Sequence, residues 1–383
     1  MISPTTTDAA LLIPPPMALP APSALLTLLQ VLTFFGHLVL VNILLGSVML
    51  AILDRRAAIP DEKNGVAFMP KTLALAVNFA IAPFLFLQVL YGNYLYTSII
   101  LMTVWWLALV PAVMLAYYGL YLSDSEIPVS RRTVLIPTAL LLLAAAFLLT
   151  SASTLMQRPD QWLHWFSAPH GMLLNLGDAT LFPRYLHIVL ASLAAGGLTM
   201  AWRADRSLRH PETDVDEALW RRRRGLAWFF HTSLAQIAAG LLFLFTQPAS
   251  IRALFLGGSF LHTAALILAA ACLIPALFMA RRGCLGLTSA AALGVILVMV
   301  CNRFMIRDAM LQPYHKLQAS VSPAALAMPH GQSTALAMFL ICAVLSIPVL
   351  VWLIRVVLHA LRSTGALPQN NRRAGAEAEA GEN

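Results

Sequence analysis

Long apolar runs, each bounded by polar or charged residues, dominate the chain. A helix that crosses a bilayer needs about 20 apolar residues, because each residue advances ~1.5 Å and the hydrocarbon core is ~30 Å thick. The pattern therefore predicts an all-α polytopic membrane protein with about nine transmembrane helices. The nine runs cover residues 24–53, 72–97, 100–122, 133–156, 182–202, 225–247, 257–280, 285–306 and 333–361.

The distribution of Lys and Arg predicts how these helices are oriented. Basic residues occupy alternate connections, whereas residues 1–23 and the connection near residue 98 contain none. Under the positive-inside rule, this places the N-terminus outside and the C-terminus in the cytoplasm. An eight-span count is the alternative if the second and third runs, separated by Gly92, Asn93 and a few polar neighbours, are one span; the alternation favours nine. The basic residues concerned are Arg55, Arg56, Lys63, Lys71, Arg131, Arg132, Arg203, Arg206, Arg209, Arg221–Arg224, Arg281, Arg282, Arg372 and Arg373.

Composition agrees with a protein embedded in lipid. Hydrophobic residues make up 59% of the chain and charged residues 11%, unlike a soluble domain. The net charge of +8 lies mostly in the basic connections, which would face anionic lipid, so it implies no nucleic-acid partner. We expect a multi-pass protein of the bacterial inner (cytoplasmic) membrane. Its parts would be a periplasmic segment, 1–23, a transmembrane helical domain, 24–362, and a disordered cytoplasmic tail, 363–383.

Three histidines, His37, His187 and His262, stand inside the apolar runs. An ionisable side chain within a membrane span is costly and therefore suggests function, and imidazole is a common protein ligand of haem iron. His187 would lie ~8–9 Å into its span and His262 ~7–8 Å into its own, both entering from outside. Two histidines at matching depth suit a six-coordinate haem b. The alternative is that His187 and His262 only form hydrogen bonds between helices and that His37 is a buried histidine bonded to a backbone carbonyl. The four cysteines form no C-x-x-C-H pattern, which argues against covalent c-type haem.

A charged group follows the eighth run. Arg303 and Arg307 are four residues apart and share a helix face, at the level proposed for the haem. We therefore expect both to pair with haem propionates. Asp308 would pair with these arginines or ligate iron. The alternative is an ordinary interfacial cluster with a local ion pair.

Short motifs occur along the chain in a fixed order. They are Gln30 with His37, Asn78-Phe79-Ala80, Tyr91-Gly92-Asn93, Met156-Gln157-Arg158-Pro159, Arg184-Tyr185-Leu186-His187 and Gln312-Pro313-Tyr314. In this order they resemble the motifs of subunit I of cytochrome bd quinol oxidase, a nine-span protein with its N-terminus outside. The resemblance implies that His37 ligates a high-spin haem and that His187 ligates a low-spin haem b.

The chain also departs from that family. His262 falls where the family has a methionine ligand, which would make the low-spin pair bis-histidine. Asp308 replaces a glutamate that ligates a high-spin haem. No carboxylate lies between Glu62 and Asp124, where the family has two glutamates near its oxygen-reducing site. The long quinol-binding loop is also absent, because only about ten residues, 247–256, join two spans.

These features predict a membrane haem-b electron-transfer subunit that holds one to three haems b and is not itself an oxygen reductase. It would be an oxidoreductase subunit if it acts as an enzyme. It would pass electrons between the quinone pool, with quinone as a candidate substrate, and a periplasmic partner such as a c-type cytochrome or another redox subunit. A second membrane subunit is a further candidate partner. The alternatives are a divergent terminal quinol oxidase and a haem-free transporter or structural membrane subunit.

Overall fold

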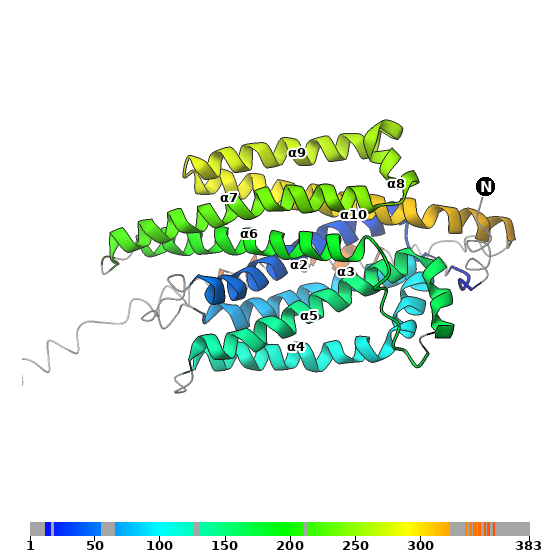
Figure 1. Ribbon diagram of the computed structural model, residues 1–383, viewed down its shortest axis with the longest axis horizontal. Coiled ribbons are helices and arrows are strands. Elements are labelled where there is room, and N and C mark those ends of the chain that lie inside the picture. The colour runs from blue at the N-terminus through cyan, green and yellow to red at the C-terminus, as the bar shows by residue number, and fades with distance from the viewer. Residues whose placement is uncertain are drawn as a thin grey trace, which may run out of the picture. The chain divides into compact units, whose positions relative to one another are not determined.

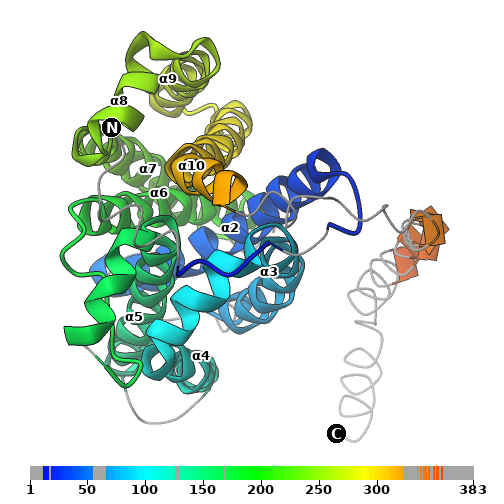
Figure 2. The ribbon, with the colours of Figure 1, turned by 90° about the vertical axis from the view of Figure 1, so that its right-hand side faces the viewer.

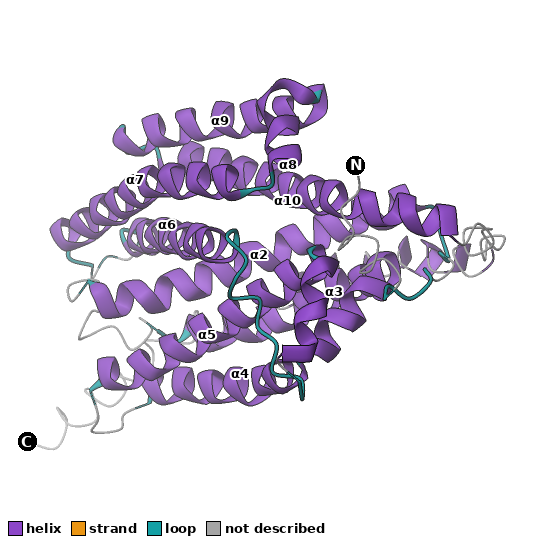
Figure 3. Ribbon diagram, turned by 45° about the vertical axis from the view of Figure 1, so that its right-hand side comes forward, coloured by secondary structure: helices purple, strands orange, loops and turns teal. Residues whose placement is uncertain are grey.

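The computed structural model describes residues 12–16, 19–54, 66–125, 130–167, 169–209, 211 and 213–321, together with separate positions between 334 and 356. This part of the chain is helical and contains no strand (Figure 3). In chain order the elements are α2 (Ser23–Leu53), α3 (Phe68–Leu101), α4 (Thr103–Asp124), α5 (Arg131–Gln157), the 3-10 helix η1 (Pro159–Ser167), α6 (Leu181–Ser207), α7 (Val215–Thr246), α8 (Ala249–Ala253), the π-helix η2 (Leu254–Gly258), α9 (Phe260–Arg281) and α10 (Leu285–Val321).

Eight of these elements, namely every α-helix except the short α8, are long and apolar enough to cross a membrane. They carry the first eight predicted runs, one run on each helix. The second and third runs form separate helices that meet at Met102. The ninth run, 333–361, lies partly outside the described residues; its described positions are helical and belong to a second unit, described by itself. The tail 363–383 lies outside the described residues.

The outward faces of the bundle carry large apolar side chains. On α4, Leu107 is 64% exposed and Met114 67%, and on α9 Ile274 is 67% exposed. Soluble monomers rarely expose continuous apolar surface on this scale. The helices also contain internal prolines, which membrane helices tolerate. The chain is therefore an all-α, multi-pass membrane protein whose outer helices face lipid.

The ends of the long helices fall into two sets (Figure 1). Helices α2, α4, α6 and α9 end at one end of the bundle, which we call the basic end because described basic residues lie near it, among them Lys71, Arg131, Arg221–Arg224 and Arg281. The break at Met102 and the segments 158–180 and 247–259 lie at the opposite end. The positive-inside rule assigns the basic end to the cytoplasm, and this orientation stays a prediction.

Glycines let three neighbouring helices approach closely. A Cβ atom at Gly46 of α2 would lie 2.7 Å from the backbone nitrogen of Gly196 in α6. One at Gly197 would lie 2.6 Å from the carbonyl oxygen of Gly225 in α7. Both distances are shorter than real Cβ contacts allow, so only glycine fits. The small residues that follow His187 on α6 therefore pack helix against helix.

The start of α9 differs from the prediction. The run was expected to begin near Gly257, but Gly257 has φ 109°, a left-handed conformation that favours glycine. Ser259 is extended, and α9 begins at Phe260. Residues 249–258 instead form α8 and η2 at the opposite end. His262 consequently lies in the first turn of its helix, nearer the helix end than the length of the apolar run predicted.

Candidate functional site

His37 lies near the middle of α2 and faces α3. Its Nδ1 is 2.9 Å from the carbonyl oxygen of Ala76, and a carbonyl can only accept, so Nδ1 carries the proton. The ring also lies 6.2 Å from that of Phe34. Its Nε2 has no hydrogen-bond partner among the described residues and keeps its lone pair. Histidines that ligate metals commonly donate their other ring N–H to such an acceptor, and a buried histidine without a ligand role forms the same bond, so this contact fits both roles expected of His37.

His187 lies in the second turn of α6 and faces α7. Its Nε2 is 3.3 Å from the side-chain nitrogen of Gln236. Its Nδ1 is buried and has no hydrogen-bond partner among the described residues. A Cβ at Gly240 would lie 3.2 Å from the imidazole, so glycine leaves the ring its space. A buried, unsatisfied polar atom costs stability, and in native proteins it commonly marks a function or a missing ligand.

The structure places His37 and His187 at the same level. Helices α2 and α6 are neighbours that both run from the opposite end toward the basic end. They cross at Gly46 and Gly196, and each histidine precedes the glycine of its own helix by nine residues, or ~13.5 Å. The two side chains face different neighbours, α3 and α7. They mark two separate sites at one depth.

The expected pairing of His187 with His262 receives no support from contacts. The Nδ1 of His262 is 2.9 Å from the hydroxyl of Ser259, and its ring packs edge-on at 5.1 Å from Phe255. Among the described residues, no hydrogen bond or ring contact joins His262 to His187. Figures 1 and 2 show α7 between α6 and α9. His262 therefore stays a separate candidate ligand.

Arg303 and Arg307 lie inside the bundle together with a third arginine, Arg184, to which the sequence analysis gave no role. Arg184 and Arg307 are only 7% and 3% exposed. Arg303 interacts electrostatically with both. These three residues, from α6 and α10, form what we call the arginine cluster. Arg184 stands in an apolar run just as His187 does, so the rule that singled out the histidines could have found it.

Neutral side chains accept most of the hydrogen bonds that the arginine cluster donates. Arg184 donates to Gln157 at 3.1 Å, and its Nε has no hydrogen-bond partner among the described residues. Arg303 donates to Ser153 at 2.9 Å, and Arg307 to Gln30 at 3.3 Å. The cations also lie over aromatic rings, with Arg184 5.1 Å from Phe243, Arg303 5.3 Å from Phe34 and Arg307 3.8 Å from Tyr91.

One carboxylate, Asp308, is hydrogen-bonded to the arginine cluster in the described part of the chain. It lies 3.5 Å from the Nε of Arg307, accepts from the hydroxyl of Tyr91 at 2.5 Å, and its side chain is 51% exposed. Asp178 interacts electrostatically with Arg184 but pairs with Arg158. Buried charges need partners, so the cluster has an excess of positive charge that suits an anion.

The arginine cluster adjoins both histidine sites. The ring of Phe34 contacts His37 on α2 and also the guanidinium of Arg303. Arg184 precedes His187 by three residues and so lies on the same face of α6. Each histidine thus has an arginine of the cluster as a near neighbour. A ligand with one iron and two carboxylates could use both kinds of residue.

No group of three or more His, Cys, Asp or Glu able to hold a metal ion occurs among the described residues. Separate histidines such as His37 and His187 could still serve a haem, because haem takes few ligands from the protein. The unsatisfied Nδ1 of His187 and Nε of Arg184 are consistent with a ligand at this place.

No protein-family model, curated protein or solved structure matches this chain. The site must therefore be interpreted from its own geometry and from the motif resemblance.

Next to the candidate site, a polar junction closes the opposite end of the bundle. Asp160 of η1 accepts from Arg158 at 2.9 Å, from Gln161 at 2.8 Å and from Tyr314 at 3.0 Å. Burial alone would raise the pKa of Asp160, but these hydrogen bonds and the charge of Arg158 outweigh it and hold the pKa below its usual value. The same pairing raises the pKa of Arg158.

This junction predicts a pH-dependent stability. Because the pKa of Asp160 is lowered on folding, its contribution is present above the unfolded value of about 3.9 and is lost as the pH falls through the folded pKa. We expect Asp160→Asn to lower the free energy of unfolding by about 1–3 kcal/mol at pH 7 and by much less below pH 3. Thermal melts of the wild-type protein and of Asp160→Asn in detergent, between pH 3 and pH 7, would measure the difference in their stability. A difference that does not become smaller toward low pH contradicts the prediction. Glu217→Gln, which removes an exposed ion pair, serves as a control expected to cost less than about 1 kcal/mol.

Proposed function

We propose that this chain is a membrane haem-b electron-transfer subunit. It would pass electrons between the quinone pool and a periplasmic redox partner such as a c-type cytochrome. The observation that carries the proposal is the arrangement of His37 and His187. They stand at one level on adjacent helices that run in the same direction, and each lies beside an arginine of the cluster that has no carboxylate hydrogen-bonded to it among the described residues.

In this proposal the chain supplies ligands, charge and a dry environment. His37 offers Nε2, and its bond to the Ala76 carbonyl holds the ring in place. His187 would offer a ligand to the iron of a second haem, and His262 remains a candidate for a further ligand. The arginine cluster would hold propionates, because a guanidinium fork matches a carboxylate. Asp308 would pair with Arg307 rather than ligate iron. When bound, haem supplies the one-electron chemistry.

Electron transfer is favoured over oxygen reduction by the distribution of acids. Reduction of oxygen consumes protons, and intramembrane carboxylates commonly carry them. Between Glu62 and Asp124, a stretch that includes all of α3, the chain has none. The motif resemblance to cytochrome bd subunit I supports the haem itself. Rapid oxygen uptake driven by quinol in the purified complex would instead support the divergent quinol oxidase.

One observation also favours a second candidate. Three arginines inside a bundle, with one hydrogen-bonded carboxylate among the described residues, could equally bind an anionic substrate in a haem-free transporter. Ionisable residues that face a bundle interior commonly mark substrate pathways. In that case the histidines would serve as hydrogen-bonding groups.

A visible spectrum separates the two candidates. The chain would be expressed with a haem precursor, purified in detergent, and recorded in its oxidised and dithionite-reduced forms. We expect a b-type difference band and at least one haem b per chain by the pyridine haemochrome assay. A colourless, folded protein obtained with ample haem supply contradicts the proposal. Uptake of anions into vesicles that contain this protein would then test the transporter.

A further inference from the structure

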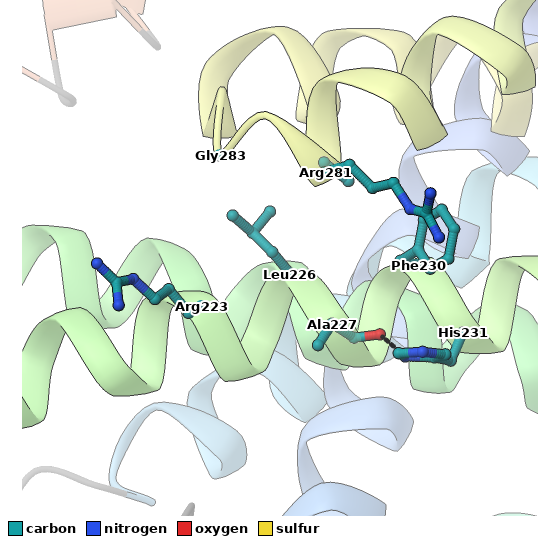
Figure 4. A pocket seen from close by; sticks show the side chains of 8 residues that line it. Arg223, Leu226, Ala227, Phe230, His231, Arg281 and Gly283 are labelled. Carbon is teal, nitrogen blue, oxygen red and sulfur yellow. Dashed lines mark hydrogen bonds between the residues drawn. The ribbon is translucent and has the colours of Figure 1, made fainter.

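A pocket of ≈ 280 Å³ opens between α7 and α9 near the basic end, away from the candidate haem site. Figure 4 shows the residues that line it. Arg223, Leu226, Phe230 and His231 come from successive turns of α7, and Arg281 comes from the end of α9. The pocket thus combines cationic side chains with apolar ones.

The two arginines of this pocket have no acidic partner among the described residues, unlike the other three arginines of the 221–224 run. Arg223 forms no hydrogen bond or ion pair with any residue that the structure describes. Arg281 lies over the ring of Phe230, 4.5 Å from its centroid, and pairs with no described carboxylate. By contrast, the other arginines of the 221–224 run pair with Glu217, Asp205 and Asp54 at 2.9, 3.1 and 2.7 Å, respectively. Within the 221–224 run, the arginine without an acidic partner among the described residues is thus the one that lines the pocket.

An apolar track leads from the pocket toward the middle of the bundle. On α7, Leu234, Ile237 and Leu241 are exposed and continue the helix face of Ala227 and His231 at spacings of three or four residues. From residue 231 to residue 241 this track extends ~15 Å. A ligand of the pocket would therefore meet cations at one end and hydrocarbon along the other.

We propose that this pocket is a binding site for an anionic phospholipid. The headgroup phosphate would lie between Arg223 and Arg281, and an acyl chain would follow the track on α7. A free anion would use only the charged end, whereas a phospholipid matches both ends. Basic pockets between transmembrane helices on the cytoplasmic side are typical sites for anionic headgroups, and the basic residues place this end there by the positive-inside rule.

Native mass spectrometry of the delipidated full chain would test the proposal. The probes are dioleoyl phosphatidylglycerol, dioleoyl phosphatidylcholine and inorganic phosphate. Each arginine near an anionic lipid contributes about fivefold to binding, so Arg223→Gln with Arg281→Gln should weaken phosphatidylglycerol binding roughly 30-fold. Arg221→Gln, in the same run but paired with Glu217 outside the pocket, should leave it unchanged. Both arginines of the pocket are exposed, so unaltered melting without lipid would show that the double variant folds.

The outcomes are distinct. Preferential binding of phosphatidylglycerol over phosphatidylcholine that is lost in the folded double variant supports the proposal. Equal binding of both lipids, or unchanged binding in the double variant, overturns it. If inorganic phosphate binds as tightly as phosphatidylglycerol, the site accepts free anions and the lipid assignment is wrong. None of these results depends on whether the chain holds haem.

Discussion

Replacing His187 with alanine is expected to remove the low-spin b-type signal of the purified protein. The change removes the imidazole that α6 offers at this level. Mutation of a residue that only hydrogen-bonds to a metal ligand already lowers metal affinity by about 10–100-fold, and loss of the ligand itself should cost more. Haem affinity at this site should therefore fall by more than about 100-fold. Reduced-minus-oxidised spectra and electron paramagnetic resonance would measure the loss, and a signal that survives unchanged would show that the ligand is wrongly assigned.

Further comparisons distinguish the loss of an iron ligand in His187→Ala from general damage to the fold. Imidazole added to His187→Ala should enter the vacated space and restore part of the signal if His187 binds iron, whereas a misfolded protein would not respond. His164→Ala, at an exposed position of η1, should leave the spectrum unchanged. His37→Ala should remove a different signal, because the two side chains face different helices; the motif resemblance predicts that this signal is high-spin.

The second large effect is expected at the crossing of α2 and α6. In Gly46→Ala the new methyl group would meet the backbone of Ser192 and Gly196, and neither backbone can move without shifting a helix. Overpacking usually costs about 1–3 kcal/mol, and a clash with backbone belongs at or above the upper end of this range. We expect a strongly reduced yield of folded protein and a lower melting temperature in detergent. Gly196→Ala should behave alike.

A matched control exists in α10. A Cβ added at Gly286 meets no atom within 4 Å, so Gly286→Ala should be neutral or stabilise its helix by up to about 1 kcal/mol. Because both changes add one methyl group to a helix, the difference between them isolates the crossing. If Gly46→Ala melts like Gly286→Ala, the close approach of the two helices is not required for the fold.

The sequence was most informative about the transmembrane helices, because the lipid bilayer restricts which backbone structures can cross it. In lipid, backbone groups must be satisfied within a helix, so the length of the apolar runs predicted the long helices. The separation of α3 from α4 was favoured by the alternation of basic residues between connections. The start of α9 was predicted about three residues too early, because the left-handed conformation of Gly257 and the extended Ser259 keep the first residues of the apolar run out of the helix. Periodicity and hydropathy do not report such local backbone geometry.

The candidate site was only partly predictable, because its contacts join distant parts of the chain. Arg303 and Arg307 were expected from their spacing on one helix. Their partners Ser153 and Gln30 come from other helices. The level placement of His37 and His187 depends on which glycines meet, and this is a property of tertiary packing. A search for charged residues within every apolar run would have added Arg184.

The parallel course of α2 and α6 has an electrical consequence. A charge that crosses the whole membrane gains or loses about 2.3 kcal/mol per 100 mV of membrane potential. An electron that passed between groups held by His37 and His187 would travel along the membrane plane, since the two residues stand at one depth. That step would be nearly independent of voltage. Electron transfer between these two groups would then neither generate a membrane potential nor be slowed by one, whatever the size of that potential.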